Sequence, residues 1–265
     1  MSLHYGKHAV RFYRTDGRTT LFAAEVALDV SGSGFLPAYT RGDNSMVVPT
    51  DTMNNFVHAT ALEYPGATLE EFLALLGRRF LETYGHVEHL RLRARELGFG
   101  RESPVLFQRL HDDYEVAELV MDRGGIREHR SGREALHLVK ITGSSFTEFL
   151  RDGYTTLPEA RDRPLFIHLN VYWRYATFTE RVASRAVRDL VGETFAGFVS
   201  QSIQHLLHEM AQRVLARFPA IDEVTLEAEN RLWDTSRTSE GDPRVKVYSD
   251  PRPPFGVVGY TRKRA

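Results

Sequence analysis

Residues 79–94 read RFLETYGHVEHLRLRA and residues 213–228 read RVLARFPAIDEVTLEA, and the two stretches align without a gap. Every expected buried position is apolar in both copies, for example Phe80 in the first and Val214 in the second. In both, apolar residues at helical spacing give way at the same point to the alternation of a strand. The offset is close to half of the 265 residues, which favours internal duplication over chance similarity of two helix–strand units.

On both sides of these two stretches, the sequence predicts groups of strands that alternate with groups of helices. Helices are predicted between Thr50 and Pro65, between Thr68 and Gly85, and over residues 180–195 and 200–217. Polar loops are predicted at 97–112 and 234–243. Alternating or β-branched runs predict strands at 8–14, 20–30, 44–49, 87–96, 114–122, 135–142, 164–178, 221–229 and 244–249.

This order predicts an α+β protein made of two similar modules, residues 1–130 and 131–265. Each module would place antiparallel strands in a sheet and its pair of helices on one face of that sheet. Such a sheet leaves its other face and two edge strands uncovered. Closing several copies into a barrel removes the edges, so we expect an oligomer with sites at subunit boundaries.

Charge and composition exclude several classes of protein. Lysine and arginine number 34 against 35 acidic residues, so no net field favours nucleic acid or an anionic membrane. The sequence has no cysteine, which excludes disulfides, thiolate nucleophiles and cysteine-ligated metals. No stretch approaches the ~18 apolar residues of a membrane helix, and the first ten residues do not read as a signal peptide. We expect a soluble, cytoplasmic protein.

Motifs for cofactors or metals are weak. His205 and His208 share a helical face, and His86 and His89 have the same spacing, but neither pair has a third ligand. Residues 31–34, SGSG, lack the following helix of a phosphate-binding loop. We therefore expect no metal and no cofactor, which leaves a cofactor-free enzyme or a binding protein.

Short strings in both halves of the chain resemble, in order, the motifs of the bacterial, cofactor-independent urate oxidases (uricases). The similarity spans nearly the whole chain. The strings are Tyr5–Lys7, Gly42–Ser45, Val48–Asn55, Gly143–Phe146, Arg151–Leu157, Asp162–Pro164, Ser202–Gln204, Asn230–Asp234 and Pro251–Gly256.

The resemblance implies two tandem tunnelling-fold modules per chain, assembled as a homotetrameric barrel. It also implies a reaction of purine degradation in which urate, O2 and water give 5-hydroxyisourate and hydrogen peroxide without a cofactor. The partners implied are urate, O2 and further copies of the chain, with sites shared between subunits.

The resemblance also implies the residues that bind urate, a flat anion with polar groups around its rim. Phe146 matches the stacking phenylalanine and Arg163 matches the arginine that clamps one edge. Gln204 matches the glutamine that reads the opposite edge. The main-chain N–H groups of Ile203 and Asp51 match those that meet the purine, and amides at a helix start are free to donate.

Lys7 and Thr50 match the catalytic pair of the family, in which the hydroxyl passes a proton from the substrate to the amine. Many members continue with an Asn-x-His motif that holds oxygen or water and extends this relay. Here the stretch lacks the histidine, and either Asn230 or Glu229 occupies the oxygen-side position. This departure leaves two alternatives open: a protein that binds a purine or pterin without oxidising it, or an enzyme for another heterocycle.

Overall fold

The computed structural model describes residues 3–111 and 113–264. The chain divides into two compact units, unit 1 over Met1–Gly132 and unit 2 over Arg133–Ala265. The boundary expected from the sequence, after residue 130, lies two residues earlier. Strand β7 (Gly125–Lys140) runs through the division and contributes to the sheet of each unit.

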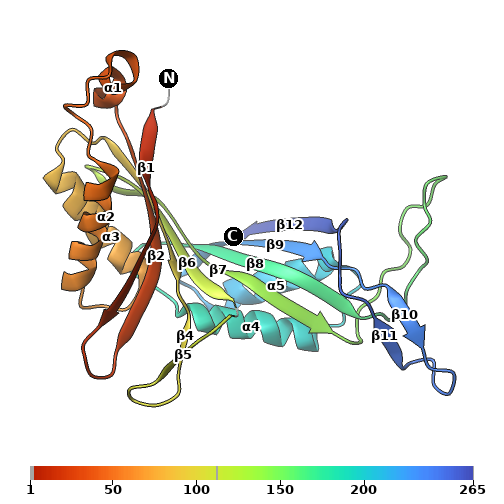
Figure 1. The fold of residues 1–265 in the computed structure, drawn as a ribbon. Helices are drawn as coiled ribbons and strands as arrows, with labels where there is room; N and C mark the ends of the chain where they lie inside the picture. Colours follow the sequence, from red (N-terminus) through yellow and green to blue (C-terminus); the bar gives the residue numbers. More distant parts are fainter. Residues whose placement is uncertain (1–2, 112, 265) are drawn as a thin grey trace. The chain divides into compact units, whose positions relative to one another are not determined.

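Unit 1 is an antiparallel sheet with two helices on one face (Figure 1). Helix α2 packs against β1, and α3 packs against β3 and β6. The strand order is β1–β2–β3–β6–β7. The elements are β1 (His4–Thr15), β2 (Leu21–Ser31), α2 (Thr50–Glu63), α3 (Leu69–Thr83), β3 (His89–Glu96) and β6 (Tyr114–Asp122).

The core of unit 1 lies between the apolar face of α3 and the buried side chains of the strands. Helix α3 buries residues spaced three and four apart, which is the apolar face expected from the sequence. Gly77 faces the sheet, where a Cβ atom would collide with Met121 Sδ, so this glycine permits the close approach of α3 to β6. The strands contribute alternate buried residues, among them Val26, Leu28 and Val30.

Unit 2 repeats this plan with the strand order β7–β8–β9–β12 and with α4 and α5 packed together (Figure 1). Its core joins α4 and α5 to buried residues of β8 and β9, with Trp173 the largest side chain. The elements are β8 (Leu165–Tyr175), α4 (Ser184–Gly197), α5 (Ile203–Arg217), β9 (Ile221–Asn230) and β12 (Gly256–Lys263). The predicted α+β class with antiparallel sheets is confirmed.

In each unit, an arginine just after a strand donates to carbonyls near the C-terminal end of the second helix. Arg123 follows β6 and donates to the carbonyl of Gly85, just beyond α3. Arg264 follows β12 and donates to the carbonyls of Leu215 at 2.6 Å and Phe218 at 2.9 Å, at the end of α5. The Leu215 carbonyl is one of those that the C-terminal turn of a helix leaves without a helical partner, whereas Gly85 lies just beyond its helix.

The structure corrects several sequence-based elements. Residues 44–49 are not a strand, because the Val47 N–H closes a turn to Asn44 and the Val48 N–H donates to the Tyr5 hydroxyl. The predicted loops contain short strands that pair locally, and the apolar pattern missed β12 and the first half of β7. The predicted strand at 244–249 contains β11 (Lys246–Tyr248). The unpredicted elements are the turn η1 (Ser33–Phe35), α1 (Leu36–Arg41), β4 (Phe99–Arg101), β5 (Phe107–Arg109) and β10 (Thr235–Thr238).

Within the described residues, none of the helices combines the length and apolar character needed to cross a bilayer. The cytoplasmic location expected from the sequence stays a prediction.

Candidate functional site

Arg163 lies at the entry to β8, where the sequence brings a guanidinium into a partly buried position. Its backbone N–H donates to the Ser144 carbonyl at 2.9 Å, and its Cζ atom lies 5.7 Å from the centroid of the Phe146 ring. Burial lowers the pKa of the Arg163 guanidinium below its ordinary value. Its Nε atom is buried and has no hydrogen-bond partner among the described residues. A partly buried cation with an unpartnered donor suits an anionic ligand.

Phe146 is fixed by an isolated antiparallel bridge to Ala160, with N···O distances of 2.7 and 3.0 Å. The ring of Phe149 stacks on the Phe146 ring with centroids 4.8 Å apart and planes within 12°. Phe146, the predicted stacking residue, therefore already stacks against a flat ring, that of Phe149. Phe149 was not identified from the sequence. Its only signal was a second phenylalanine three residues after Phe146.

The start of α5 is joined to the same segment. The Ser145 N–H donates to the Ser200 carbonyl at 2.8 Å, and the Ser200 N–H donates to the Gly143 carbonyl at 3.2 Å. The Ser202 hydroxyl caps α5 by accepting from the His205 N–H at 3.1 Å. Ile203 and Gln204 are the first residues of the helix, Ile203 buried and Gln204 exposed. Unit 2 thus joins the segments that carry Phe146 and Arg163 to Ser200, which lies three residues before the first residue of α5.

A cavity of about 380 Å³ lies in unit 2 beside Arg163. It includes two of the predicted residues, Arg163 and Asn230, but neither Phe146 nor Gln204. The cations in its wall outnumber the single carboxylate, Asp162. The lining is Pro158, Ala160, Asp162, Arg163, Pro164, Phe166, Asn230, Arg231, Leu232, Trp233, Thr235, Lys246 and Tyr248.

Strand geometry separates Asn230 from Glu229, the two candidates for the oxygen-side position. Asn230 follows the buried residues Leu226 and Ala228 on the helix-facing side of β9, and it lines the cavity. Glu229 points to the opposite face, where its carboxylate accepts from Arg231 Nη1 at 3.0 Å and lies 3.6 Å from His168 Nδ1. The geometry favours Asn230 as the cavity residue.

Unit 1 places Lys7 on the helix-facing side of its sheet. Lys7 lies directly opposite Leu28 on β2, and opposite residues of an antiparallel pair share a face. A bulge between Lys7 and Val10 keeps Val10 on the same face although two residues separate them. Ala9 within the bulge has a φ of 56°, a conformation that costs energy for a residue with a Cβ atom.

Thr50 and Asp51 begin α2, which packs against β1. The turn before α2 is tied to β1 two residues from Lys7, because the Val48 N–H donates to the Tyr5 hydroxyl at 2.8 Å. Lys7 and Thr50 therefore belong to elements that touch. No hydrogen bond between them is present among the described residues. Lys7, Thr50 and Asp51 come from unit 1, whereas the other predicted residues come from unit 2.

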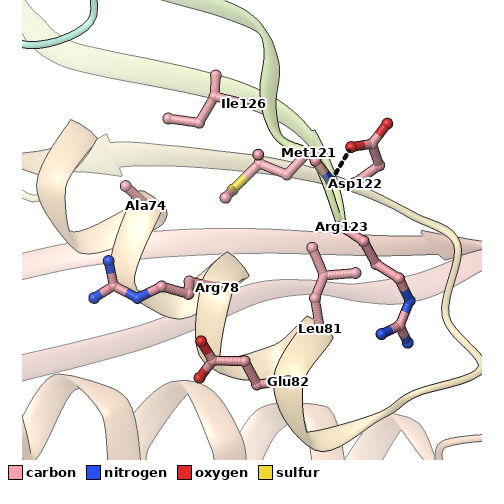
Figure 2. A pocket seen from close by; sticks show the side chains of 10 residues that line it. Ala74, Arg78, Leu81, Glu82, Met121, Asp122, Arg123 and Ile126 are labelled. Atoms are coloured by element: carbon pink, nitrogen blue, oxygen red, sulfur yellow. Dashed lines mark hydrogen bonds between the residues drawn. The ribbon is translucent and has the colours of Figure 1, made fainter.

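A larger cavity, of about 540 Å³, lies in unit 1 between α3 and the β6–β7 turn (Figure 2). Ala74, Leu81, Met121 and Ile126 form its apolar part, and the Asp122 carboxylate accepts from the Gly124 N–H at 2.7 Å. It contains none of the predicted site residues. Among residues 3–111 and 113–264, no group of three or more His, Asp or Glu side chains is placed to hold a metal ion.

Comparison with known proteins gives one consistent result. A family model described as uricase matches residues 3–118 and 129–259. The uric acid degradation bifunctional protein of Bacillus sp. (strain TB-90) is 35% identical over 98% of this chain, and the match covers 60% of its own length. The uricase of Halalkalicoccus jeotgali is 36% identical over 99% of this chain and 98% of its own.

Solved structures agree with these matches. The urate oxidase of Bacillus sp. TB-90 has a TM-score of 0.94 at 35% identity, with 99% of this chain and 100% of that chain covered. A uricase from Bacillus fastidious has a TM-score of 0.91 at 34% identity, covering 99% of this chain and 94% of that chain. The chain spans about three fifths of the length of the bifunctional relatives that it matches.

Proposed function

Because this chain belongs to the uricase family, we propose that it is a urate oxidase. The proposed reaction takes urate, O2 and water to 5-hydroxyisourate and hydrogen peroxide, an early step of purine degradation. Urate loses two electrons and O2 gains them, while one oxygen atom of water enters the product. The reaction uses no metal or organic cofactor in this proposal.

The observation that carries the proposal is the meeting of Phe146, Arg163 and the start of α5. An aromatic face, a planar cation with free donors and open helix N–H groups match the flat, anionic, hydrogen-bonding outline of urate. Backbone hydrogen bonds hold the three segments together, so the contacts are in place before the substrate binds. Ile203 would donate its N–H, and Gln204 would read the edge opposite Arg163.

Lys7 and Thr50 supply the proposed proton path. A hydroxyl between the substrate and a neutral amine can accept a proton from urate and pass it on, which leaves a more reducing anion. The position of Lys7 on the helix-facing side of β1, next to the element that begins with Thr50, supports this assignment. Asp51 would meet the purine through its free main-chain N–H at the start of α2.

Asn230 is the proposed contact for O2 or water, since it lines the cavity beside Arg163. Its amide can both donate and accept, which suits a site that receives O2 and water and releases peroxide. Enclosing these species limits their escape before the chemistry is complete.

We propose further that the two units are tandem tunnelling-fold modules and that four chains close into a barrel. The shared strand plan and the similar positions of Arg123 and Arg264 near the end of the second helix of each unit support the modules. The edge strands β1 and β12 support assembly, because each carries unpaired backbone groups on one side. In this tetramer, unit 1 of one chain and unit 2 of a neighbour complete each site.

The test is a urate assay with urate absorbance, dissolved oxygen and hydrogen peroxide followed in one sample. We expect equal amounts of urate and O2 to be consumed and peroxide to be released, with no loss of rate after treatment with a metal chelator. No turnover in air, or turnover under strict anaerobic conditions, would contradict the proposal. Tight urate binding with no peroxide would instead support the binding protein suggested by the missing histidine.

A further inference from the structure

Asp162, the residue before Arg163, connects the segment that carries Phe146 to the segment that carries Arg163. Its carboxylate accepts from the Thr142 hydroxyl at 2.6 Å and from the Gly143 N–H at 2.7 Å. These donors lie some twenty residues away in the chain, on the turn that leads to Phe146. The carboxylate therefore joins the two ends of the long connection between β7 and β8.

The groups that donate hydrogen bonds to the Asp162 carboxylate are neutral, and the charge of the carboxylate also interacts with the Lys140 ammonium. Hydrogen bonds from the Thr142 hydroxyl, and then from the Gly143 N–H, lower the pKa of Asp162 below its ordinary value. The carboxylate stays ionised at neutral pH, and its acceptor capacity is directed at the 142–143 turn. Gly143, with a φ of 77°, turns the chain so that its N–H meets this acceptor.

We propose that Asp162 is a positioning residue of the urate site. It holds the 142–146 segment against Arg163, so that the Phe146 ring and the guanidinium keep the separation that urate requires. This inference rests on the proposed function. Asp162 acts through the backbone of two segments and is not itself proposed to touch the substrate.

Two neighbouring contacts show why the carboxylate has this influence. The Arg163 N–H donates to the Ser144 carbonyl at 2.9 Å, and the buried Ser144 also bridges to the buried Ser200 ahead of α5. The 142–146 segment thus lies between the two other segments that carry urate contacts. Most of the rest of the connection is exposed, with Leu150 at 88% and Tyr154 at 94%, so packing holds it only in part. Preorganisation by Asp162 would lower the entropy lost when urate binds.

The test substitutes Asp162→Asn, which keeps the shape and places an NH2 group where a second acceptor oxygen stands. The amide oxygen can still accept from the Gly143 N–H, but the NH2 group can only donate to the Thr142 hydroxyl, which must then act as acceptor, and the negative charge is lost. Urate affinity is measured anaerobically by difference absorbance, so that no turnover occurs. We expect the Kd for urate to rise by about tenfold or more, since small displacements of positioning groups have effects of this order.

The matched control is Asp152→Asn in the same connection. The Asp152 carboxylate accepts from the Tyr154 N–H at 2.9 Å and the Thr155 hydroxyl at 3.0 Å, all within its own turn. It carries no bond to the Arg163 segment, so its replacement should leave the urate Kd within about twofold. At saturating urate, kcat of Asp162→Asn should fall less than affinity, because the Lys7 and Thr50 pair is untouched.

A urate Kd for Asp162→Asn within twofold of the control overturns the inference, as does a loss of kcat without a loss of affinity. If Asp162→Asn does not fold, Thr142→Val removes one of the same bonds with little change in shape. A threefold or larger rise in Kd then supports the inference, and an unchanged Kd overturns it. A wild-type protein that neither binds nor oxidises urate contradicts the proposed function instead.

Discussion

At the scale of single residues, Arg163 has unusual surroundings for an arginine. Most arginines are solvated or paired, whereas this guanidinium is partly buried, lies near an aromatic ring and has an unpartnered Nε. Burying donors without partners costs free energy that a ligand can recover. The position therefore suits a group whose partner arrives from outside the chain.

We expect Arg163→Lys to weaken urate binding by more than tenfold with little change in Tm. Lysine keeps the charge but loses the planar pair of donors, and a hydrogen bond to a charged group contributes about 1.5–3 kcal/mol. Anaerobic titration with urate measures the change. Arg161→Lys, at an exposed position two residues away, is the control. An affinity for urate unchanged within twofold would refute the clamp role.

Lys7→Met and Thr50→Ala should each lower kcat by ~10²- to 10⁴-fold, the usual effect of losing a general base. If the two side chains form one proton path, the double variant should be little worse than the poorer single variant. Steady-state kinetics at saturating urate give the comparison, and Thr40→Ala on α1 controls for loss of a hydroxyl elsewhere. Additive losses in the double variant would argue against a shared path.

At the scale of elements, the bulge in β1 sets the face on which Lys7 lies. With Ala9 at positive φ, Ala9→Gly should raise the free energy of unfolding by about 0.5–1 kcal/mol, because glycine adopts this conformation without steric cost. Ala9→Val should lower it by more than ~1 kcal/mol. Urea unfolding measures both variants. The same change at Ala23, in regular β2, should destabilise; a loss of stability in Ala9→Gly would contradict this account.

A second element-scale prediction concerns neighbouring strands in unit 2. His168 on β8 stacks on His137 of β7 with ring centroids 3.8 Å apart and lies opposite Glu229 of β9. Burial, then His137 and Arg231, lower the pKa of His168 against the opposing effect of Glu229. The unfolded chain therefore takes up this proton first as pH falls. The contribution of neutral His168 to the free energy of unfolding is therefore present above about pH 6.5, the ordinary pKa of histidine, and is lost as the pH falls towards the lower pKa of the folded state.

We therefore expect His168→Gln to reduce the fall in Tm between about pH 7.5 and pH 5.5, because glutamine does not titrate. Differential scanning calorimetry at the two pH values gives the comparison. His58→Gln, at an exposed position on α2, is the control and should keep the wild-type fall in Tm. An unchanged fall in His168→Gln would show that other groups dominate the acid sensitivity.

At the scale of the whole molecule, the division of the predicted residues between two units can be tested by mixing chains. Lys7→Met chains carry an intact unit 2, and Arg163→Ala chains carry an intact unit 1. If neighbouring subunits share each site, random mixing in equal amounts should restore about a quarter of the sites.

Urate oxidation after unfolding and refolding the two inactive variants together measures the restored fraction. Each variant refolded alone provides the background rate. Native mass spectrometry confirms that mixed assemblies have formed. No activity in verified mixed assemblies would place both halves of the site within a single chain.

The amino-acid sequence by itself determined the repeated helix–strand order, the apolar faces of α3 and α5, and the family. These features depend on local spacing. A helix or strand that buries one face places apolar residues at a fixed spacing, and that spacing can be found within a short stretch of sequence. The family motifs likewise lie in short, contiguous strings. The sequence could not show β12 or the first half of β7, because these stretches have few apolar residues that are buried, so the pattern of a strand with one buried face is weak in them.

Only the tertiary structure decided which residues meet. Segments far apart in the chain come together in three cases: the Gly143 N–H donates to Asp162, Ser144 bridges to Ser200, and Asn230 rather than Glu229 lines the cavity. Such pairings follow from strand register and from turns at particular φ values, which neighbouring residues do not specify alone. A carboxylate beside an arginine is ordinary in a sequence, and its role becomes visible only when folding brings its distant donors to it.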